Sequence, residues 1–469
     1  MAKLKRSELR AHLLRSVQIL KTSLTYTAYC SFILTMLFFN FVMETSGEYG
    51  GLQHTQLVVS PSVIHPRAPS GRKKLRFQDD LAEAFSGLEY DNPMLKWVLL
   101  RALPETPLPD ADLLAYHDQL DRLQTATGVF SNPDSFSYAY EYWIEQLATL
   151  TVKRGLSFYT QPSLVRLMVE LLKPIEGMSV YDPSVGTGGT LVQAARYVEQ
   201  HDGNPATMAF YGREKSPDIW AICKMNMLAH GLDNAVIEQG DTLQMASAST
   251  TTFDLVLQDL PLSPNRRSGQ LADAAFLRHA VQSLAPDGRA AILCSSSVAQ
   301  NDHPEFWRFV LSHDWLEAVI SLPPQLLQGT PSGASLFIFN KQKSPDRLSH
   351  VLFIQAAPDL VPRSRYNQLP DDAIQTVVQI YEQWDNSAKD ARIIPVQQIE
   401  EQNYRLNVDR YLEWVEAPQP FNVNVALNRY RTAVQKRDEA VDGLMKALER
   451  LSYAAGESKD GISKDGTQS

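Results

Sequence analysis

Two hydrophobic patterns divide this chain. Over residues 1–150, apolar positions recur at helical spacing, from Leu9 to Phe41 and again, interrupted by prolines, from Phe85 to Leu123. From about residue 155, short apolar runs alternate with amphipathic stretches, as strands and helices do in turn. The sequence therefore predicts a helical N-terminal domain over 1–150 and an α/β domain over 151–415.

The second pattern predicts a doubly wound, mostly parallel sheet. The expected strands are 179–181, 208–212, 236–238, 253–258, 290–294, 316–321 and 335–339. The expected helices are 190–199, 217–230, 273–284, 305–312 and 371–384. Such alternation places helices on both faces of a sheet, and ligands bind where the strands end. The residues that follow these strands are therefore the first candidates for a site.

A heptad pattern marks the region after residue 415. The first set of apolar positions is Leu427, Val434, Val441 and Leu448, and the second is Tyr430, Arg437, Leu444 and Leu451. Apart from Arg437, this is the seam of a coiled coil. We expect 416–454 to be a C-terminal coiled-coil-like helix that binds a partner subunit; a helix folded back on its own domain is the alternative. The repeated Ser-Lys-Asp-Gly in 455–469 predicts a disordered tail.

An uncharged segment over residues 22–43 follows a basic N-terminus, as in a membrane anchor. Polar residues dilute it, namely Thr22, Ser23, Thr25, Thr27, Ser31, Thr35 and Asn40. We therefore prefer a helix buried between other helices and expect no membrane contact; a membrane helix is the alternative.

Composition and charge limit the partners. The chain has 469 residues and a formal net charge of −9. Because phosphate contacts need clustered Lys and Arg, we expect so acidic a chain to meet DNA only through local basic loops or through a more basic partner. The basic run 72–76 is either a solvated linker or a phosphate contact. Cys30, Cys223 and Cys294 lie far apart, so we expect neither disulfides nor a metal site, and a cytoplasmic location.

A glycine-rich turn follows the strand at 179–181. Its candidate cofactor residues are Asp182, Pro183, Gly186, Thr187, Gly188 and Gly189. The glycines allow a tight turn and close approach of a ligand. Glu214 ends the next strand, where a carboxylate suits a ribose diol, and Asp241 and Thr242 follow the third, where Asp241 can accept from an adenine amine. Neither a Walker lysine nor GxGxxG is present, so we predict an adenosyl cofactor without a polyphosphate.

With these motifs in this order, the chain resembles the modification (M) subunit of type I restriction–modification systems, an N6-adenine DNA methyltransferase family. Residues 157–160, 164–168, 316–320 and 404–407 resemble further segments of that family. The resemblance implies a Rossmann-like doubly wound methyltransferase sheet, S-adenosyl-L-methionine as cofactor, and Tyr159 and Thr160 as further cofactor contacts. It also implies a complex with a DNA-recognition (specificity) subunit, a second modification subunit and a restriction subunit, with DNA bound mainly through the specificity subunit.

The catalytic motif departs from the family pattern. The family has Asn-Pro-Pro-Phe where this chain has Asp259, Leu260, Pro261 and Leu262. A side-chain oxygen and a backbone carbonyl accept the hydrogens of the adenine amine, and Asp259 and the Leu260 carbonyl can still do so. The stiff Pro-Pro backbone is lost, however, and Leu262 replaces a ring whose stacking on a flipped-out base contributes ~1–3 kcal/mol. Phe158 and Tyr159 are the rings that could substitute.

Two functions therefore remain open from the sequence. The first is an adenine-N6 DNA methyltransferase subunit that uses Asp259 as the amine acceptor. The second is a degenerate subunit that keeps the fold, the cofactor pocket and the partner helix but does not transfer methyl groups.

Overall fold

The computed structural model describes residues 5–20, 26–45, 57–60, 63, 77–151, 159–245, 251–261, 266–300, 303–326, 333–356, 368–384, 386 and 389–412, with a few positions between 427 and 442. The chain divides into two units, Met1–Leu412 and Glu413–Ser469. Of the expected heptad positions, only Leu427, Val434 and Arg437 are described, and the basic run 72–76 and the expected tail lie outside the described residues. The fold below is that of the first unit.

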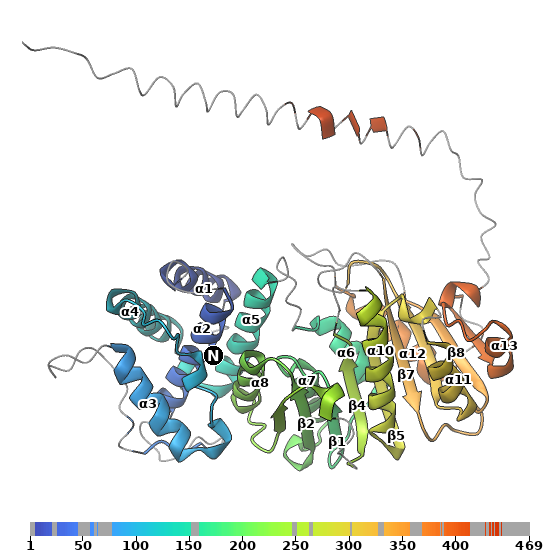
Figure 1. Cartoon of the computed structure of the whole chain (residues 1–469), viewed down its shortest axis with the longest axis horizontal. Helices are drawn as coiled ribbons and strands as arrows, with labels where there is room; N and C mark the ends of the chain where they lie inside the picture. Colours follow the sequence, from blue (N-terminus) through green and yellow to red (C-terminus); the bar gives the residue numbers. More distant parts are fainter. Residues whose placement is uncertain are drawn as a thin grey trace, which may run out of the picture. The chain divides into compact units, whose positions relative to one another are not determined.

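Helices make up the described N-terminal part, as its apolar spacing predicts (Figure 1). They are α1 (Arg6–Leu20), α2 (Tyr26–Thr45), α3 (Phe77–Asp91), α4 (Asp110–Thr127) and α5 (Pro133–Thr151), with short 3-10 turns at Pro93–Leu95, Leu100–Ala102 and Val129–Ser131. Helix α4 shows why they begin and end where they do. Asp110 and Asp112 stand in its first turn, where the helix dipole favours negative charge, and Gly128 ends it in the left-handed conformation.

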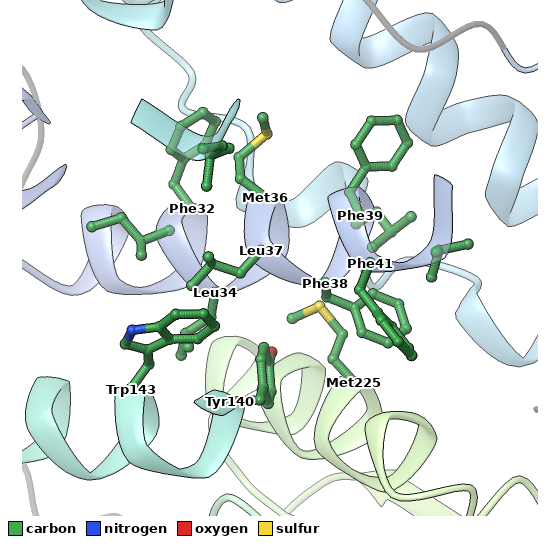
Figure 2. Close-up of a cluster of buried hydrophobic side chains, with 14 of the residues drawn as sticks. Phe32, Leu34, Met36, Leu37, Phe38, Phe39, Phe41, Tyr140, Trp143 and Met225 are labelled. Carbon is green, nitrogen blue, oxygen red and sulfur yellow. The ribbon is translucent and has the colours of Figure 1, made fainter. Parts of the chain in front are cut away.

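Helix α2 is a core helix. Among the described residues, one window, Ala28–Thr45, is long and apolar enough to cross a membrane, but 78% of it is buried inside the protein. Figure 2 shows its side chains beside Tyr140 and Trp143 of α5 and Met225 of the sheet domain. A helix that is apolar all round requires such burial. The interpretation of this segment as a helix buried between helices is thus confirmed.

A nine-stranded sheet forms the second part, in the order β3-β2-β1-β4-β5-β7-β6-β8-β9. The strands are β1 (Ser179–Asp182), β2 (Ala209–Glu214), β3 (Val236–Gln239), β4 (Phe253–Asp259), β5 (Leu284–Ser295), β6 (Leu316–Leu322), β7 (Ala334–Asn340), β8 (His350–Gln355) and β9 (Ala391–Pro395). Strands β1 to β5 pair in parallel, whereas β7 is antiparallel to both β5 and β6, and β9 to β8. The predicted doubly wound, mostly parallel sheet is confirmed; β8 and β9 were not predicted as strands.

Helices cover both faces of this sheet. They are α6 (Pro162–Leu172), α7 (Gly189–Gln200), α8 (Pro217–Ala229), α9 (Thr242–Met245), α10 (Arg266–Gln282), α11 (Pro304–Ser312), α12 (Asp371–Gln383) and α13 (Val396–Glu401). Alternate strand residues point to opposite faces. Leu255 and Leu257 of β4 therefore join the core under α6, α7 and α12, while Val256 joins the core under α10 and α11.

Strand β5 begins at Leu284, earlier than the expected 290. The sequence Pro286-Asp287-Gly288 suggests a turn, but Leu284 pairs with Phe253 of β4 across an irregularity in register. Gly288 makes this possible, because a Cβ there would lie 2.8 Å from the Phe253 carbonyl oxygen. The glycine therefore serves a close approach of two backbones instead of a chain reversal.

Helix α8 belongs to two cores. Cys223 and Met227 pack in the core of the sheet under α7, whereas Ala221, Ile222 and Met225 pack with α2 and α5. The N-terminal helices and the sheet are thus joined by one shared helix. The expected domain boundary near residue 150 remains a prediction.

Candidate functional site

The strand order reverses between β1 and β4, so their carboxyl ends, Asp182 and Asp259, are neighbours. Open α/β sheets bind ligands at such a point, because the connections leave the two strands in opposite directions and form a crevice. The described candidate residues at the ends of β1, β2, β3 and β4 lie at this edge. It is therefore the place where the predicted cofactor and catalytic residues come together.

Asp182 organises the glycine turn from within. It is 2% exposed, and its carboxylate accepts hydrogen bonds from the backbone N–H of Ser184 (2.9 Å) and from the Thr190 hydroxyl. Burial, together with the smaller effect of the charges of Asp259 and Glu214, raises the pKa of Asp182 to about 7, although these hydrogen bonds oppose the shift. Asp182 therefore connects the glycine-rich loop, through Ser184, to the start of α7, through Thr190.

The glycines of the turn serve different ends. Gly186 and Gly188 have positive φ angles of 53° and 88°, which favour glycine. A Cβ at Gly188 would also overlap Met227 Cε and lie 3.0 Å from Cys223 Sγ of α8. At Gly189, by contrast, an added Cβ would meet nothing within 4 Å. The turn is thus packed on α8 on one side and faces open space at the N-terminus of α7 on the other.

Asn226 attaches the same turn to α8. Its side-chain Nδ2 donates to the Thr187 carbonyl at 2.8 Å, and both side chains are buried. Pro183 is held from the other direction, since the Thr242 hydroxyl donates to its carbonyl oxygen. Both hydrogen bonds restrain the backbone of the turn.

Glu214 and Asp241 stand where the second and third strands end. The Glu214 carboxylate accepts from the backbone N–H of Ser216 at 2.7 Å and also from Gly186 and Lys215, and burial raises its pKa. Asp241 lies 2.9 Å from Lys215 Nζ, and the hydrogen bond from Lys215 lowers its pKa. Their contacts with a ribose and an adenine remain predictions.

Asp259, the candidate amine acceptor, is held by Thr160. The Thr160 hydroxyl donates to Asp259 Oδ2 at 2.9 Å, and Oδ1 accepts no hydrogen bond from the described residues. Burial raises the pKa of Asp259 to about 7, whereas the hydrogen bond from Thr160 opposes this shift. Thr160 therefore lies beside the catalytic candidate, although the resemblance implies a cofactor contact for it.

The backbone around Asp259 is also fixed. Ser184 Oγ of the glycine turn donates to the Asp259 carbonyl at 3.0 Å, and the Leu260 N–H donates to the Leu293 carbonyl of β5 at 2.9 Å. A proline at position 260 could not make the second bond. The loss of stiffness expected from the missing proline is thus offset by a hydrogen bond that leucine allows.

The structure describes only one of the residues considered for stacking on the base. Leu262 and Phe158 lie outside the described residues. Tyr159 is half-buried and packs against the hydrophobic core of the N-terminal helices. Stacking of any of these positions on a base stays a prediction.

Three polar residues of this edge were not among the sequence candidates: Ser184, Asn226 and Gln258. Each had a signal. Ser184 lies inside the glycine turn, Asn226 is a polar residue on a largely apolar helix, and Gln258 interrupts an apolar strand. Their partners, which give them their roles, come from other elements.

The charges of the edge limit what it can bind. The carboxylates of Asp182, Glu214 and Asp259 end three adjacent strands, and burial raises the pKa of each. Because like charges disfavour one another, a cationic ligand in this place would be stabilised. An adenosyl ligand with a positively charged sulfonium fits these three carboxylates and the open space at Gly189.

The sheet order and the glycine turn define a Rossmann-like methyltransferase fold. Residues 131–419, more than half of the chain, match the model of the N-6 DNA Methylase family. The chain belongs to this family, which confirms the resemblance inferred from its motifs.

Individual relatives agree with this assignment. The chain is 28% identical over 341 residues to the type I restriction enzyme HindI methylase subunit of Haemophilus influenzae, covering 67% of this chain and 75% of the relative. It is 25% identical to the MjaVII methylase subunit of Methanocaldococcus jannaschii, covering 68% of this chain and 60% of the relative. In structure, it resembles the type I restriction–modification methyltransferase subunit from Streptococcus thermophilus, with a TM-score of 0.72, 22% identity and coverage of 87% and 100% of the two chains. The last likeness shows the fold.

Proposed function

We propose that this chain is the modification subunit of a type I restriction–modification system, a DNA methyltransferase that modifies adenine at N6. One observation carries the proposal. Asp259, at the end of β4, is connected to the glycine turn after β1 by the hydrogen bond from Ser184 Oγ to its carbonyl. The acceptor for the amine and the candidate cofactor turn are therefore parts of one site. Family membership and the likeness to methylase subunits support the same activity.

The proposed cofactor is S-adenosyl-L-methionine, which supplies an electrophilic methyl group when bound. Pro183 to Gly189 would enclose it, with the open space at Gly189 as the point of approach. Glu214 would accept from the ribose hydroxyls and Asp241 from the adenine amine. The buried carboxylates of Asp182 and Asp259 would favour the positive charge of the sulfonium.

Asp259 at the end of β4 and Leu260 directly after it act on the substrate amine. Its lone pair is delocalised into the adenine ring, so it becomes nucleophilic only as its nitrogen turns tetrahedral. Asp259 Oδ1 and the Leu260 carbonyl can each accept one of its hydrogens and favour that geometry. Thr160 keeps the carboxylate in place through Oδ2. Because the pKa of Asp259 is raised to about 7, the acceptor is fully ionised only above that pH.

The proposal includes partners and a domain plan. The acidic chain would meet DNA mainly through a specificity subunit, in a cytoplasmic complex with a second modification subunit and a restriction subunit. The plan is a helical domain over 1–150, the methyltransferase domain over 151–415, a partner-binding helix over 416–454 and a disordered tail over 455–469. The heptad pattern of 416–454 supports the partner-binding helix.

The proposal is tested with the full chain, alone and together with its specificity subunit. S-adenosyl-L-methionine is titrated by calorimetry, and transfer of labelled methyl groups to genomic DNA is measured. We expect binding and transfer, a loss of about 100-fold or more in Asp259→Ala, by analogy with removal of one oxyanion contact, and retained activity in Asp259→Asn. Absence of cofactor binding contradicts the site. Tight binding without transfer, restored by Leu262→Phe, supports the degenerate alternative instead.

A further inference from the structure

The peptide unit between Asp259 and Leu260 is held at both ends. Its carbonyl, that of Asp259, accepts from Ser184 Oγ at 3.0 Å, and its N–H, that of Leu260, donates to the Leu293 carbonyl at 2.9 Å. The two groups belong to one planar unit. Two hydrogen bonds in opposite directions therefore fix the orientation of the whole plane.

The Ser184 hydroxyl is itself oriented by Gln258. The Gln258 Nε2 donates to Ser184 Oγ at 3.2 Å, and Gln258 is fully buried. A hydroxyl carries one hydrogen and accepts through its lone pairs. Since the Gln258 amide occupies an acceptor position, the hydrogen of Ser184 is directed to the Asp259 carbonyl. Gln258 thus supports the contact from inside β4.

The next carbonyl along the chain, that of Leu260, is restrained from both sides. The fixed peptide precedes it, and Pro261 follows it, which confines Leu260 to an extended backbone. The Leu260 side chain is 4% exposed and packs in the core under α10 and α11. The direction of this carbonyl is therefore determined largely by the hydrogen bonds of the peptide before it.

We propose that Ser184 is a positioning residue for methyl transfer. Its backbone belongs to the glycine turn, where its N–H donates to Asp182, while its side chain holds the Asp259–Leu260 peptide. Ser184 thus sets the position of the glycine turn relative to the Leu260 carbonyl, which accepts a hydrogen of the substrate amine. The inference rests on the proposed function, because the turn and the carbonyl must act on the two reactants of one transfer.

The test compares Ser184→Ala with Ser184→Thr in the full chain assembled with its specificity subunit. Ser184→Ala lowers the single-turnover rate about 10- to 100-fold, because small misplacements of reacting groups cost rate. The Kd for S-adenosyl-L-methionine changes less than about 2-fold, since the backbone N–H contact to Asp182 remains. Ser184→Thr keeps the hydroxyl and restores most of the rate.

A matched control removes a buried hydroxyl elsewhere. Ser283 Oγ donates to the His279 carbonyl at 2.8 Å at the end of α10, away from the strand ends of the site. Ser283→Ala leaves the single-turnover rate and the cofactor Kd unchanged. Equal losses of rate and cofactor affinity in Ser184→Ala, or a failure of Ser184→Thr to restore the rate, would overturn the inference.

A second readout needs no activity. Hydrogen–deuterium exchange of the Leu260 amide becomes faster in Ser184→Ala than in the unaltered chain and stays slow in Ser184→Thr and Ser283→Ala. If the unaltered complex binds cofactor but transfers no methyl group, the proposed function fails, and exchange alone decides whether Ser184 holds the peptide. Unchanged exchange in Ser184→Ala overturns the inference in either case.

Discussion

Thr160 and Asp259, 99 positions apart in the sequence, form a hydrogen bond of 2.9 Å from the threonine hydroxyl to Oδ2 of the carboxylate. Thr160 stands just before α6, and Asp259 ends β4. Burial favours the neutral carboxyl, whereas the Thr160 hydrogen bond favours the carboxylate. Burial and the Thr160 hydrogen bond therefore have opposite effects on the protonation of Asp259, the candidate amine acceptor, near neutral pH.

Replacing Thr160 by valine should shift the pH dependence of methyl transfer. The change removes the hydroxyl at nearly constant volume, so the pKa of Asp259 rises above about 7. When the carboxyl is protonated, its hydrogen can occupy Oδ1, which then no longer accepts from the substrate amine, so the rate falls as the pH falls through this pKa. We expect the acid limb of the single-turnover pH–rate profile to move to higher pH by about 0.5–1 unit, the worth of one hydrogen bond.

Two further variants separate this effect from a general disturbance. Thr160→Ser keeps the donor and should keep the acid limb in place. Asp259→Asn has no titrating group at this position and should lack the limb. Superimposable profiles for Thr160→Val and the unaltered protein would show that Thr160 does not influence Asp259.

Gly188 should tolerate alanine less well than another glycine of positive φ. Gly177, with a φ of 82°, has open space where a Cβ would stand, so Gly177→Ala reports backbone strain alone, about 1–2 kcal/mol. Gly188 has a φ of 88° and faces Met227 and Cys223 of α8. We expect Gly188→Ala to be less stable than Gly177→Ala by about 1–3 kcal/mol, the usual cost of overpacking, and to bind the cofactor more weakly.

The comparison is made by thermal unfolding and by cofactor titration. A second change, Met227→Ala, provides room for the new methyl group and should recover part of the cofactor binding lost in Gly188→Ala. Equal unfolding temperatures for the two alanine variants would mean that the turn is not packed on α8 as described.

Local patterns predicted the parts of this fold that depend on local causes. The strands that carry Asp182 and Glu214, the glycine turn and the helix after it follow from spacing and from glycine chemistry. The partners of Ser184 and Thr160 did not, because they lie 75 and 99 positions away and are brought close by the strand order. Strand β9 is short and its buried residues do not alternate with exposed ones, so no strand pattern marked it.

The sequence was also ambiguous where one pattern has two physical causes. An apolar helix such as α2 suits a membrane and a protein core equally, and only its neighbours in α5 and α8 decide. If α2 is a core helix, Leu37→Ala should destabilise the protein by about 2–5 kcal/mol, because Leu37 is fully buried. Leu14, which is 45% exposed, provides the control, and Leu14→Ala should change the stability by less than about 0.5 kcal/mol. Similar small effects in urea unfolding of the two variants would contradict the core assignment.

Asp182 should make the folded protein less stable as the pH rises. Its pKa is raised from 3.8 to about 7 by burial, so the folded state binds this proton more tightly than the unfolded state. The stabilisation is fully present below about pH 4 and is lost as the pH rises through about 7.

Asp182→Asn removes this titration and should therefore gain stability relative to the unaltered protein between pH 5 and pH 8, by roughly 1–3 kcal/mol. Thermal unfolding at both pH values measures the difference. Gly177→Ala changes no titratable group and should lower the stability by the same amount at both. If the difference between Asp182→Asn and the unaltered protein is also constant, Asp182 is ionised throughout, and the carboxylates at the strand ends are better solvated than their burial implies.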